Sequence, residues 1–446
     1  MTSSVPSRPN RGRARRVLVA LLLVGLLLAS VALPLAGAMG FLGPRTYLVV
    51  SLNPAELRPH GGFVGAYAVV ELSYGRVVSL EYGDSKDLDH VYAERVDSGE
   101  KPPLDVYPAL THAGHSPDFP TTARALAEAY WHIADVRPYG VIAVDPAAAA
   151  GLVRIVGPMH VRGEAEAVTD DNLVGIVLKH TQSFDDDDDD RKQFVFDLGL
   201  ELASRLRTLP PTRWLEVLQA LSTAADERHI QLHGDDPIVQ PLIHARGWDG
   251  SYPLPTDDFL AVVDSNWRLG NKANLVTDQE LDYRVAIAPD GTSIATLTIT
   301  YENRGTGGLS FSTADMPFLD QATYDADVRI YAPLGSQWLS PGDAQNPEPE
   351  LGRTVFLERV EVPPKSRHSL TVQYRLPDRR VDGGRIDYEL FVRKQAGTSA
   401  VPFTLIVTGP EGSRVGGTDK REWSAQANLL VDRRFRVAFE RISGGG

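Results

Sequence analysis

The chain of 446 residues contains no cysteine. This absence excludes disulfides, zinc–thiolate sites and thiol nucleophiles, so the protein must be stabilised by its packed cores alone. The Gly-x-Ser-x-Gly spacing of serine hydrolases and the glycine-rich loops of nucleotide-binding proteins are also missing. The histidines lack the regular spacing of metal ligands. His112 and His115 are three residues apart, but in a Pro- and Gly-rich stretch, so zinc there is the weaker alternative.

Acidic residues are missing from the first 45 positions, which carry six arginines. The remaining residues carry 39 basic and 58 acidic side chains, a net charge of −19. A body with this charge repels nucleic acid, so we expect no nucleic-acid partner, and a polyanion would need a local basic pocket. The length of the chain predicts two domains.

One long apolar run is present, VLVALLLVGLLLASVALPLAGA at residues 17–38, and it carries no charge. As a helix this run matches the ~30 Å thickness of a bilayer core. Five arginines precede it and one follows. We therefore expect a single-pass protein of the cell membrane, with a basic cytoplasmic N-terminus at 1–16 and a transmembrane signal anchor at 17–39. The body that follows the anchor is then extracytoplasmic. Cleavage after Ala38, at a string of small residues, is the alternative.

Strand and helix signals alternate over residues 46–275 and predict a layered α/β domain. Expected strands are at 47–52, 63–72, 76–82, 140–144, 229–233 and 259–264; expected helices start at Pro120 and span 147–156, 191–209, 212–225 and 238–245. The polar stretch 84–118 predicts a long loop. From Leu281 the pattern changes to short alternating strands, which predict an all-β, immunoglobulin-like sandwich over 281–440.

A charged pair and a double glycine lie between the first two expected strands. Glu56 and Arg58 precede Gly61 and Gly62 in the sequence NPAELRPHGGF. Backbone amides at such a turn, together with a guanidinium, can bind an anion. The alternative is a structural ion pair over a glycine-permitted turn.

Three further groups of polar residues are candidate ligand-binding positions. Asp84 and Asp87 can share one Mg²⁺, unless they belong to a solvated loop. Arg191 and Lys192 follow six consecutive aspartates at the start of an expected helix. A positive charge is unfavourable at this end of a helix, so we expect the aspartates or a bound anion to compensate the charge of Arg191. Asn266 and Lys272 follow an expected strand, at the edge where α/β sheets bind ligands. A structural loop is the alternative there.

Several motifs resemble the signature of a bacterial family catalogued as domain of unknown function 4012. They occur in order over about residues 46–300: Tyr47-Leu48, Asn53 to Phe63, Ser116 to Pro120, Gly157-Pro158 with Val161, Asp264 to Asn266 and Asn271 to Ala273. The resemblance implies one N-terminal membrane span and an extracytoplasmic body. It implies no reaction, because no activity is established for the family.

The order of strands, Arg-bearing loop, Asp-bearing loop and Arg-led helix is also similar to the LytR-CpsA-Psr proteins. Those are membrane-anchored phosphotransferases that move glycopolymers from polyprenyl pyrophosphate onto the cell wall. This resemblance implies catalytic roles for Arg58 and Arg191 and metal binding by Asp84 or Asp87. The chain departs from the pattern at Lys192, which separates Arg191 from Gln193. Because transfer depends on stacked cations and a metal, binding without turnover is an alternative.

These observations predict an actinobacterial-type, membrane-anchored envelope protein with an α/β domain and a β-sandwich. The leading hypothesis is that it binds or transfers a polyprenyl-pyrophosphate-linked glycopolymer, or binds a cell-wall glycan, with Mg²⁺ as cofactor. The alternative is a non-enzymatic scaffold that docks a partner on its sandwich. A deep apolar tunnel with basic groups at its mouth would favour the first, and a solid core the second.

Overall fold

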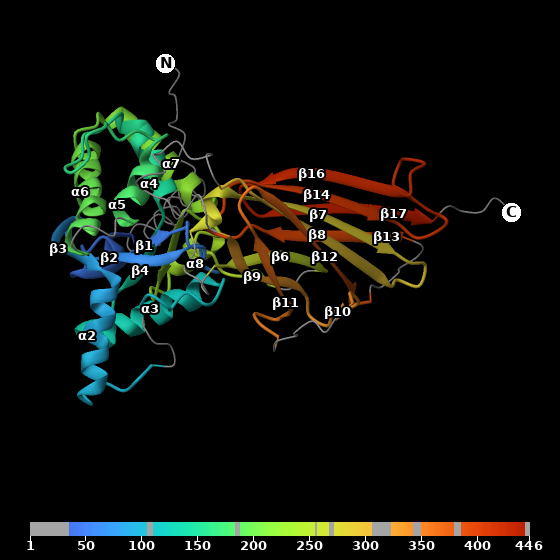
Figure 1. Ribbon diagram of the computed structural model, residues 1–446, viewed down its shortest axis with the longest axis horizontal. Coiled ribbons are helices and arrows are strands. Elements are labelled where there is room, and N and C mark those ends of the chain that lie inside the picture. Colours follow the sequence, from blue (N-terminus) through green and yellow to red (C-terminus); the bar gives the residue numbers. More distant parts are fainter. Residues whose placement is uncertain are drawn as a thin grey trace, which may run out of the picture.

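The computed structural model describes residues 35–104, 110–182, 188–254, 257–266, 272–305, 323–341, 349–378 and 385–441. Figure 1 shows two parts arranged along the long axis, one with helices around a sheet and one built from long strands. The predicted cytoplasmic segment and residues 17–34 of the predicted anchor lie outside the described residues. Within the described ranges, no helix combines the length and the apolar character needed to cross a membrane.

The first part contains a mixed five-stranded sheet with the order β3-β2-β1-β4-β5. Its strands are β1 (Arg45–Asn53), β2 (Phe63–Ser73), β3 (Arg76–Asp84), β4 (Gly140–Val144) and β5 (Ile230–Gly234). β1 and β4 are parallel, and the other neighbours are antiparallel. Alternate residues of β1, namely Leu48, Val50 and Leu52, are buried, which is the period expected for a strand that packs one face on a core.

Helices cover both faces of this sheet. α2 (Ser85–Asp97) and α3 (Phe119–Ala134) form one core with β1, β2 and β4. On the other face, α4 (Pro146–Val156) and α7 (Trp214–Asp226) pack near β4 and β5. α5 (Leu173–Gln182) and α6 (Asp188–Arg207) pack onto α4 in a separate cluster, and α8 (Val239–Ala245) lies beside β5.

The predicted loop at 84–118 is wrong in its first part, because that part forms α2. Asp84 caps this helix by accepting a hydrogen bond from the Lys86 amide at 2.9 Å. Leu88 and Tyr92, four residues apart, are buried on one side of it. Val91 is exposed and most of the other residues are polar, so the narrow buried stripe gave little periodic signal.

The second part is a β-sandwich of two six-stranded sheets, ordered β10-β12-β8-β7-β14-β16 and β11-β9-β6-β13-β17-β15. The strands are β6 (Asp258–Ser265), β7 (Thr277–Ile287), β8 (Ser293–Asn303), β9 (Tyr324–Pro333), β10 (Gln337–Trp338), β11 (Arg353–Val362), β12 (Ser366–Leu376), β13 (Arg385–Arg393), β14 (Val401–Thr408), β15 (Ser413–Val415), β16 (Glu422–Leu429) and β17 (Arg433–Arg441). Inward side chains of both sheets form one continuous core.

β6 differs from the expectation in its partners. The sequence pattern predicts this strand within the α/β domain of 46–275, but it pairs with β9 and β13 inside the sandwich. All eight of its residues are buried. A continuously apolar run predicts a central strand without indicating which sheet contains it. The sandwich therefore begins at β6.

Charged side chains of the sandwich bind backbone carbonyls of the α/β part. Arg393 donates to Ser251 O at 2.8 Å, and Lys394 Nζ donates to Glu227 O at 2.9 Å. Both side chains are buried, and burial beside Arg228 lowers the pKa of Lys394 to about 8. Buried cations persist where such hydrogen bonds satisfy them. The two parts are therefore held together by desolvated polar contacts.

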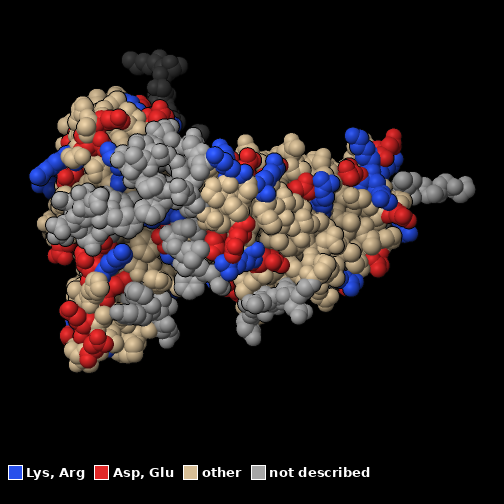
Figure 2. Space-filling view, in the orientation of Figure 1, with Lys and Arg blue, Asp and Glu red and all other residues tan. Residues whose placement is uncertain are grey.

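Charges on the outer surface are distributed differently in the two parts. On the face in Figure 2, acidic side chains gather over α2, and charges of both signs alternate over the outer end of the sandwich. The acidic surface over α2 agrees with the negative net charge of the sequence.

Candidate functional site

Asn53–Phe63, called here the signature loop, joins β1 to β2 at the end of the sheet nearest the sandwich (Figure 1). Its turn is closed by the Phe63 amide, which donates to Glu56 O at 3.0 Å. Gly61 has a φ of 127°, and a Cβ on Gly62 would lie 2.6 Å from the carbonyl carbon of Asn53. Both glycines are therefore sterically required for this turn.

Arg58 and Glu56 form a buried ion pair within the signature loop, and each residue is only 8% exposed. The Arg58 guanidinium also lies 5.7 Å from the centre of the Phe63 ring. Burial lowers the pKa of Arg58, and the Glu56 carboxylate opposes this shift. Among the described residues, the Nε of Arg58 has no hydrogen-bond partner. The guanidinium of Arg58 is thus used mainly in the ion pair with Glu56, and its Nε is the donor that this pair does not use.

Three imidazoles are close enough to this guanidinium for its charge to act on them, and their positions in the sequence do not group all three. The positive charge of Arg58 helps to lower the pKa values of His60, His112 and His115, after burial as the largest cause. His60 is completely buried and its pKa is about 4. Its Nδ1 lies 3.1 Å from Gly114 O, and its Nε2 has no hydrogen-bond partner in the described part of the chain. A Cβ on Gly114 would lie 1.8 Å from the His60 ring, so only glycine fits there.

The other side of the signature loop is docked on the sandwich. Leu57 and Asn266 exchange two hydrogen bonds: the Leu57 amide donates to Asn266 Oδ1 at 3.2 Å, and the Asn266 amide donates to Leu57 O at 2.9 Å. The Gln395 side chain donates to Arg58 O at 3.2 Å and to Asp264 O at 2.8 Å. Asn266 is fully buried. The structure therefore brings Asn266 to the predicted loop, where it serves as a structural clamp.

Lys272 lies close by in the chain. It immediately precedes the short 3-10 helix η2 (Ala273–Val276), in which Asn274 donates to Pro54 O at 2.8 Å. The short helix that follows Lys272 thus also contacts the signature loop.

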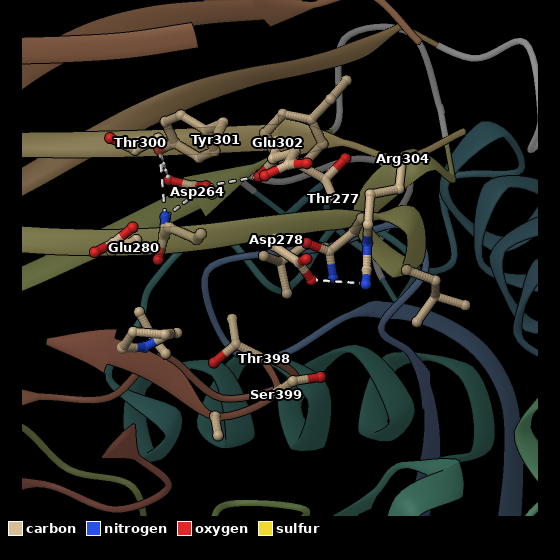
Figure 3. A pocket seen from close by; sticks show the side chains of 18 of the residues that line it. Asp264, Thr277, Asp278, Glu280, Thr300, Tyr301, Glu302, Arg304, Thr398 and Ser399 are labelled. Atoms are coloured by element: carbon tan, nitrogen blue, oxygen red, sulfur yellow. Dashed lines mark hydrogen bonds and ion pairs between the residues drawn. The ribbon is translucent and has the colours of Figure 1, made fainter. Parts of the chain in front are cut away.

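A cleft of about 480 Å³ opens beside this junction. Figure 3 shows Thr398 and Ser399 on one side and the ends of β7 and β8 on the other. Asp264, which is only 2% exposed, contributes to the lining and accepts hydrogen bonds from Tyr324, Tyr301 and Gln279. Burial raises the pKa of Asp264 to about 6, against the effect of the tyrosine hydroxyls.

The described lining of the cleft is largely polar, and it contains more acidic than basic side chains. Asp278 pairs with Arg304 at 2.8 Å, and Glu280 approaches Arg367 at 3.5 Å. Glu302 is the cross-strand neighbour of Asp278, and within the described ranges it has no ion-pair partner. Such a cleft suits a polar ligand, and its excess of carboxylates disfavours a pyrophosphate group.

The predicted metal ligands are in different environments. Asp84 caps α2, and Asp87 is an exposed residue in the first turn of the same helix. Among the residues that the structure describes, no three or more His, Asp or Glu side chains converge as a metal site would require. Mg²⁺ binding by this pair stays a prediction.

Arg191 and Lys192 are in the early turns of α6, as the sequence predicts for the backbone. The side chains of residues 182–192 lie outside the described part of the chain. The convergence of Arg58 with Arg191 therefore stays a prediction. The preceding helix, α5, does reach the signature loop, where Leu178 packs on Ala55.

Comparison with known proteins gives a family match over part of the chain and no activity. Residues 42–181 match the family model described as "Protein of unknown function (DUF4012)". No curated protein is significantly similar in sequence.

Two solved structures align with parts of the chain. One, provisionally titled a nutrient binding protein of Legionella pneumophila, is 9% identical over 37% of this chain and 67% of its own, with a TM-score of 0.25. The other, a structural genomics target from Streptococcus agalactiae, is 13% identical over 48% of this chain and 78% of its own, with a TM-score of 0.31. These scores are too low to carry an argument. The family match covers residues 42–181, about a third of the chain, and includes the whole signature loop.

Proposed function

We propose that this protein is a non-enzymatic, membrane-anchored envelope protein whose α/β domain and β-sandwich act outside the cell as one rigid interaction module. One observation carries the proposal: the signature loop uses its polar groups to clamp the two domains together. Leu57, Arg58 and Pro54 all contribute backbone groups to hydrogen bonds with the sandwich side of the junction. A loop used in this way is a structural joint.

The chemistry of the nearby cavity supports the same proposal. A polyprenyl chain needs an apolar tunnel, whereas the junction cleft is lined by carboxylates, hydroxyls and guanidinium groups. Beneath the sheet, the space between β1, α2 and α3 is filled by packed side chains of the core. The cleft therefore favours a polar partner over a lipid-linked one.

A second candidate is binding or transfer of a polyprenyl-pyrophosphate-linked glycopolymer. The unpartnered Nε of the buried Arg58 favours it, because a phosphate oxygen would satisfy that donor. In this proposal Arg191 is the second phosphate ligand, and Asp84 with Asp87 holds Mg²⁺. We also propose that the α/β domain is similar in fold to the LytR-CpsA-Psr proteins and that the sandwich is similar to immunoglobulin domains.

Replacing Arg58 tests the two candidates against each other. For the interaction module, we expect neither wild type nor Arg58→Ala to retain polyprenyl pyrophosphate in detergent micelles. Arg58→Ala should instead lower the free energy of unfolding by about 3–5 kcal/mol, because Glu56 is left buried without its partner. Retention is measured by mass spectrometry of the repurified protein, and stability by urea denaturation.

Glu56→Gln is the matched variant for this experiment. It removes the carboxylate that competes with a phosphate for Arg58, so it would strengthen retention if Arg58 binds a phosphate. Wild type that retains the lipid, with loss in folded Arg58→Ala and a gain in Glu56→Gln, would establish the second candidate and refute the first.

A further inference from the structure

Five large apolar side chains are exposed together at one end of the α/β domain. Leu35, Met39, Phe41, Leu42 and Tyr74 are between 45% and 72% exposed. We call these five residues the collar. Isolated apolar residues on a surface are ordinary, but a contiguous group of this kind marks a contact surface.

Hydrogen bonds fix the segment that carries the collar to the turn between β2 and β3 and to β1. The Tyr74 amide donates to Gly40 O at 3.1 Å, and the Gly75 amide donates to Met39 O at 2.8 Å. The Tyr47 hydroxyl donates to Ala38 O at 2.7 Å. The rings of Phe41 and Tyr74 meet edge to face, 6.4 Å apart. The segment before β1 is therefore part of the domain surface.

Further exposed apolar side chains lie on β3, an edge strand of the sheet that begins two residues after Tyr74. Val77 and Val78 are 59% and 57% exposed, and Leu80 is 40% exposed. Edge strands usually carry charges or a cover, because unprotected apolar edges promote aggregation. An exposed apolar edge strand therefore indicates that a partner surface covers this edge.

The sequence before the collar indicates what covers it. Residues 17–34 are uncharged and mostly apolar, and they connect directly to Leu35. If they cross the bilayer, the collar lies at the membrane surface with no intervening linker. Aromatic residues such as Phe41 and Tyr74 are enriched at this depth, and Arg45 and Arg76 beside them suit lipid headgroups.

The topology of the sheet then orients the whole body. β1 runs from Arg45, next to the collar, to Asn53 at the junction with the sandwich. Nine residues of strand separate these ends by about 30 Å. The collar and the sandwich thus lie at opposite ends of β1.

We propose that the collar and the exposed residues of β3 lie in the interfacial layer of the bilayer, which holds the α/β domain on the membrane and directs the sandwich away from it. This inference rests on the membrane anchor of the proposed function. The partner surface is a phospholipid bilayer, and a second copy of the chain is the competing occupant.

The absence of native cysteine allows a direct test on the full-length chain. Val78→Cys, labelled with the polarity-sensitive fluorophore NBD, is reconstituted in phosphatidylcholine–phosphatidylglycerol vesicles. The control is Leu334→Cys, which is 56% exposed in the sandwich. We expect a blue-shifted emission at position 78 and several-fold stronger quenching by doxyl-labelled lipid than at position 334. Tyr74→Asp should reduce the quenching at 78 without changing the circular dichroism spectrum.

The outcomes separate the two proposals. Failure of the full-length chain to float with the vesicles would refute the anchor and the inference that rests on it. Flotation with equal, weak quenching at both positions would leave the anchor standing and overturn the collar proposal. Disulfide formation between unlabelled Val78→Cys chains, together with weak quenching, would assign the surface to a second copy and likewise overturn it.

Discussion

Gly397→Ala is expected to lower the free energy of unfolding by about 4 kcal/mol and to loosen the junction between the domains. A Cβ at this position would lie 1.8 Å from Gly61 O in the signature loop. Gly397 also has a φ of 75°, which disfavours any other residue. The added Cβ is held in place by its own backbone and would clash with backbone atoms of Gly61, so no side-chain rotation relieves the clash. Urea denaturation measures the loss, and small-angle X-ray scattering measures the separation of the domains.

Gly412→Ala is the matched control, because Gly412 has a φ of 73° with nothing within 4 Å of the added Cβ. This variant carries the backbone strain without the clash and should cost only about 1 kcal/mol. Equal losses in the two variants would mean that the signature loop and the sandwich are not in tight contact. The rigid-module proposal would then lose its basis.

The second large effect is acid destabilisation through His60. Its pKa is about 4 in the folded protein and about 6.5 when unfolded, because burial and the nearby charges of Arg58 and His115 oppose the imidazolium. Between these pH values the unfolded chain binds more protons, so stability falls as pH falls. From pH 7 to pH 4 this group should cost about 3 kcal/mol. His112 and His115 act in the same direction.

His60→Gln and Asp264→Asn make the test specific. His60→Gln removes the titration, so its stability should fall less steeply between pH 6.5 and pH 4. Asp264 has a raised pKa of about 6, so its contribution to stability increases as pH falls through that value. Asp264→Asn should therefore steepen the acid loss. Chemical denaturation across this pH range measures both slopes, and parallel curves for wild type and His60→Gln would contradict the assignment.

Most strands could be predicted because their patterns are local. β8 along its length and β7 from Leu281 onward alternate buried residues with more exposed ones, and the Asp290-Gly291 turn lies between the two strands. α2 was missed because its apolar stripe is narrow. The partners of β6 were also missed, since a strand buried on both faces has no period that identifies its sheet.

The candidate site was only partly predictable for a related reason. The glycines of the signature loop are local requirements, and their effect on the turn follows from steric chemistry. The grouping of His60 with His112 and His115 depends on how the chain folds back at Gly114. Their spacing in the sequence carries no sign of that contact. No single-sequence signal in these residues would have revealed it.

The sequence by itself determined a cysteine-free, acidic body with an α/β part, a β-rich part and a recognisable family signature, because composition and periodicity are properties of neighbouring residues. Only the tertiary structure decided that the signature loop is a joint. The hydrogen bond from Leu57 to Asn266 joins residues 209 positions apart, and that from Gln395 to Arg58 joins residues 337 positions apart. Whether a buried arginine binds a ligand or supports a joint depends on such distant partners, and these exist only after both domains have folded.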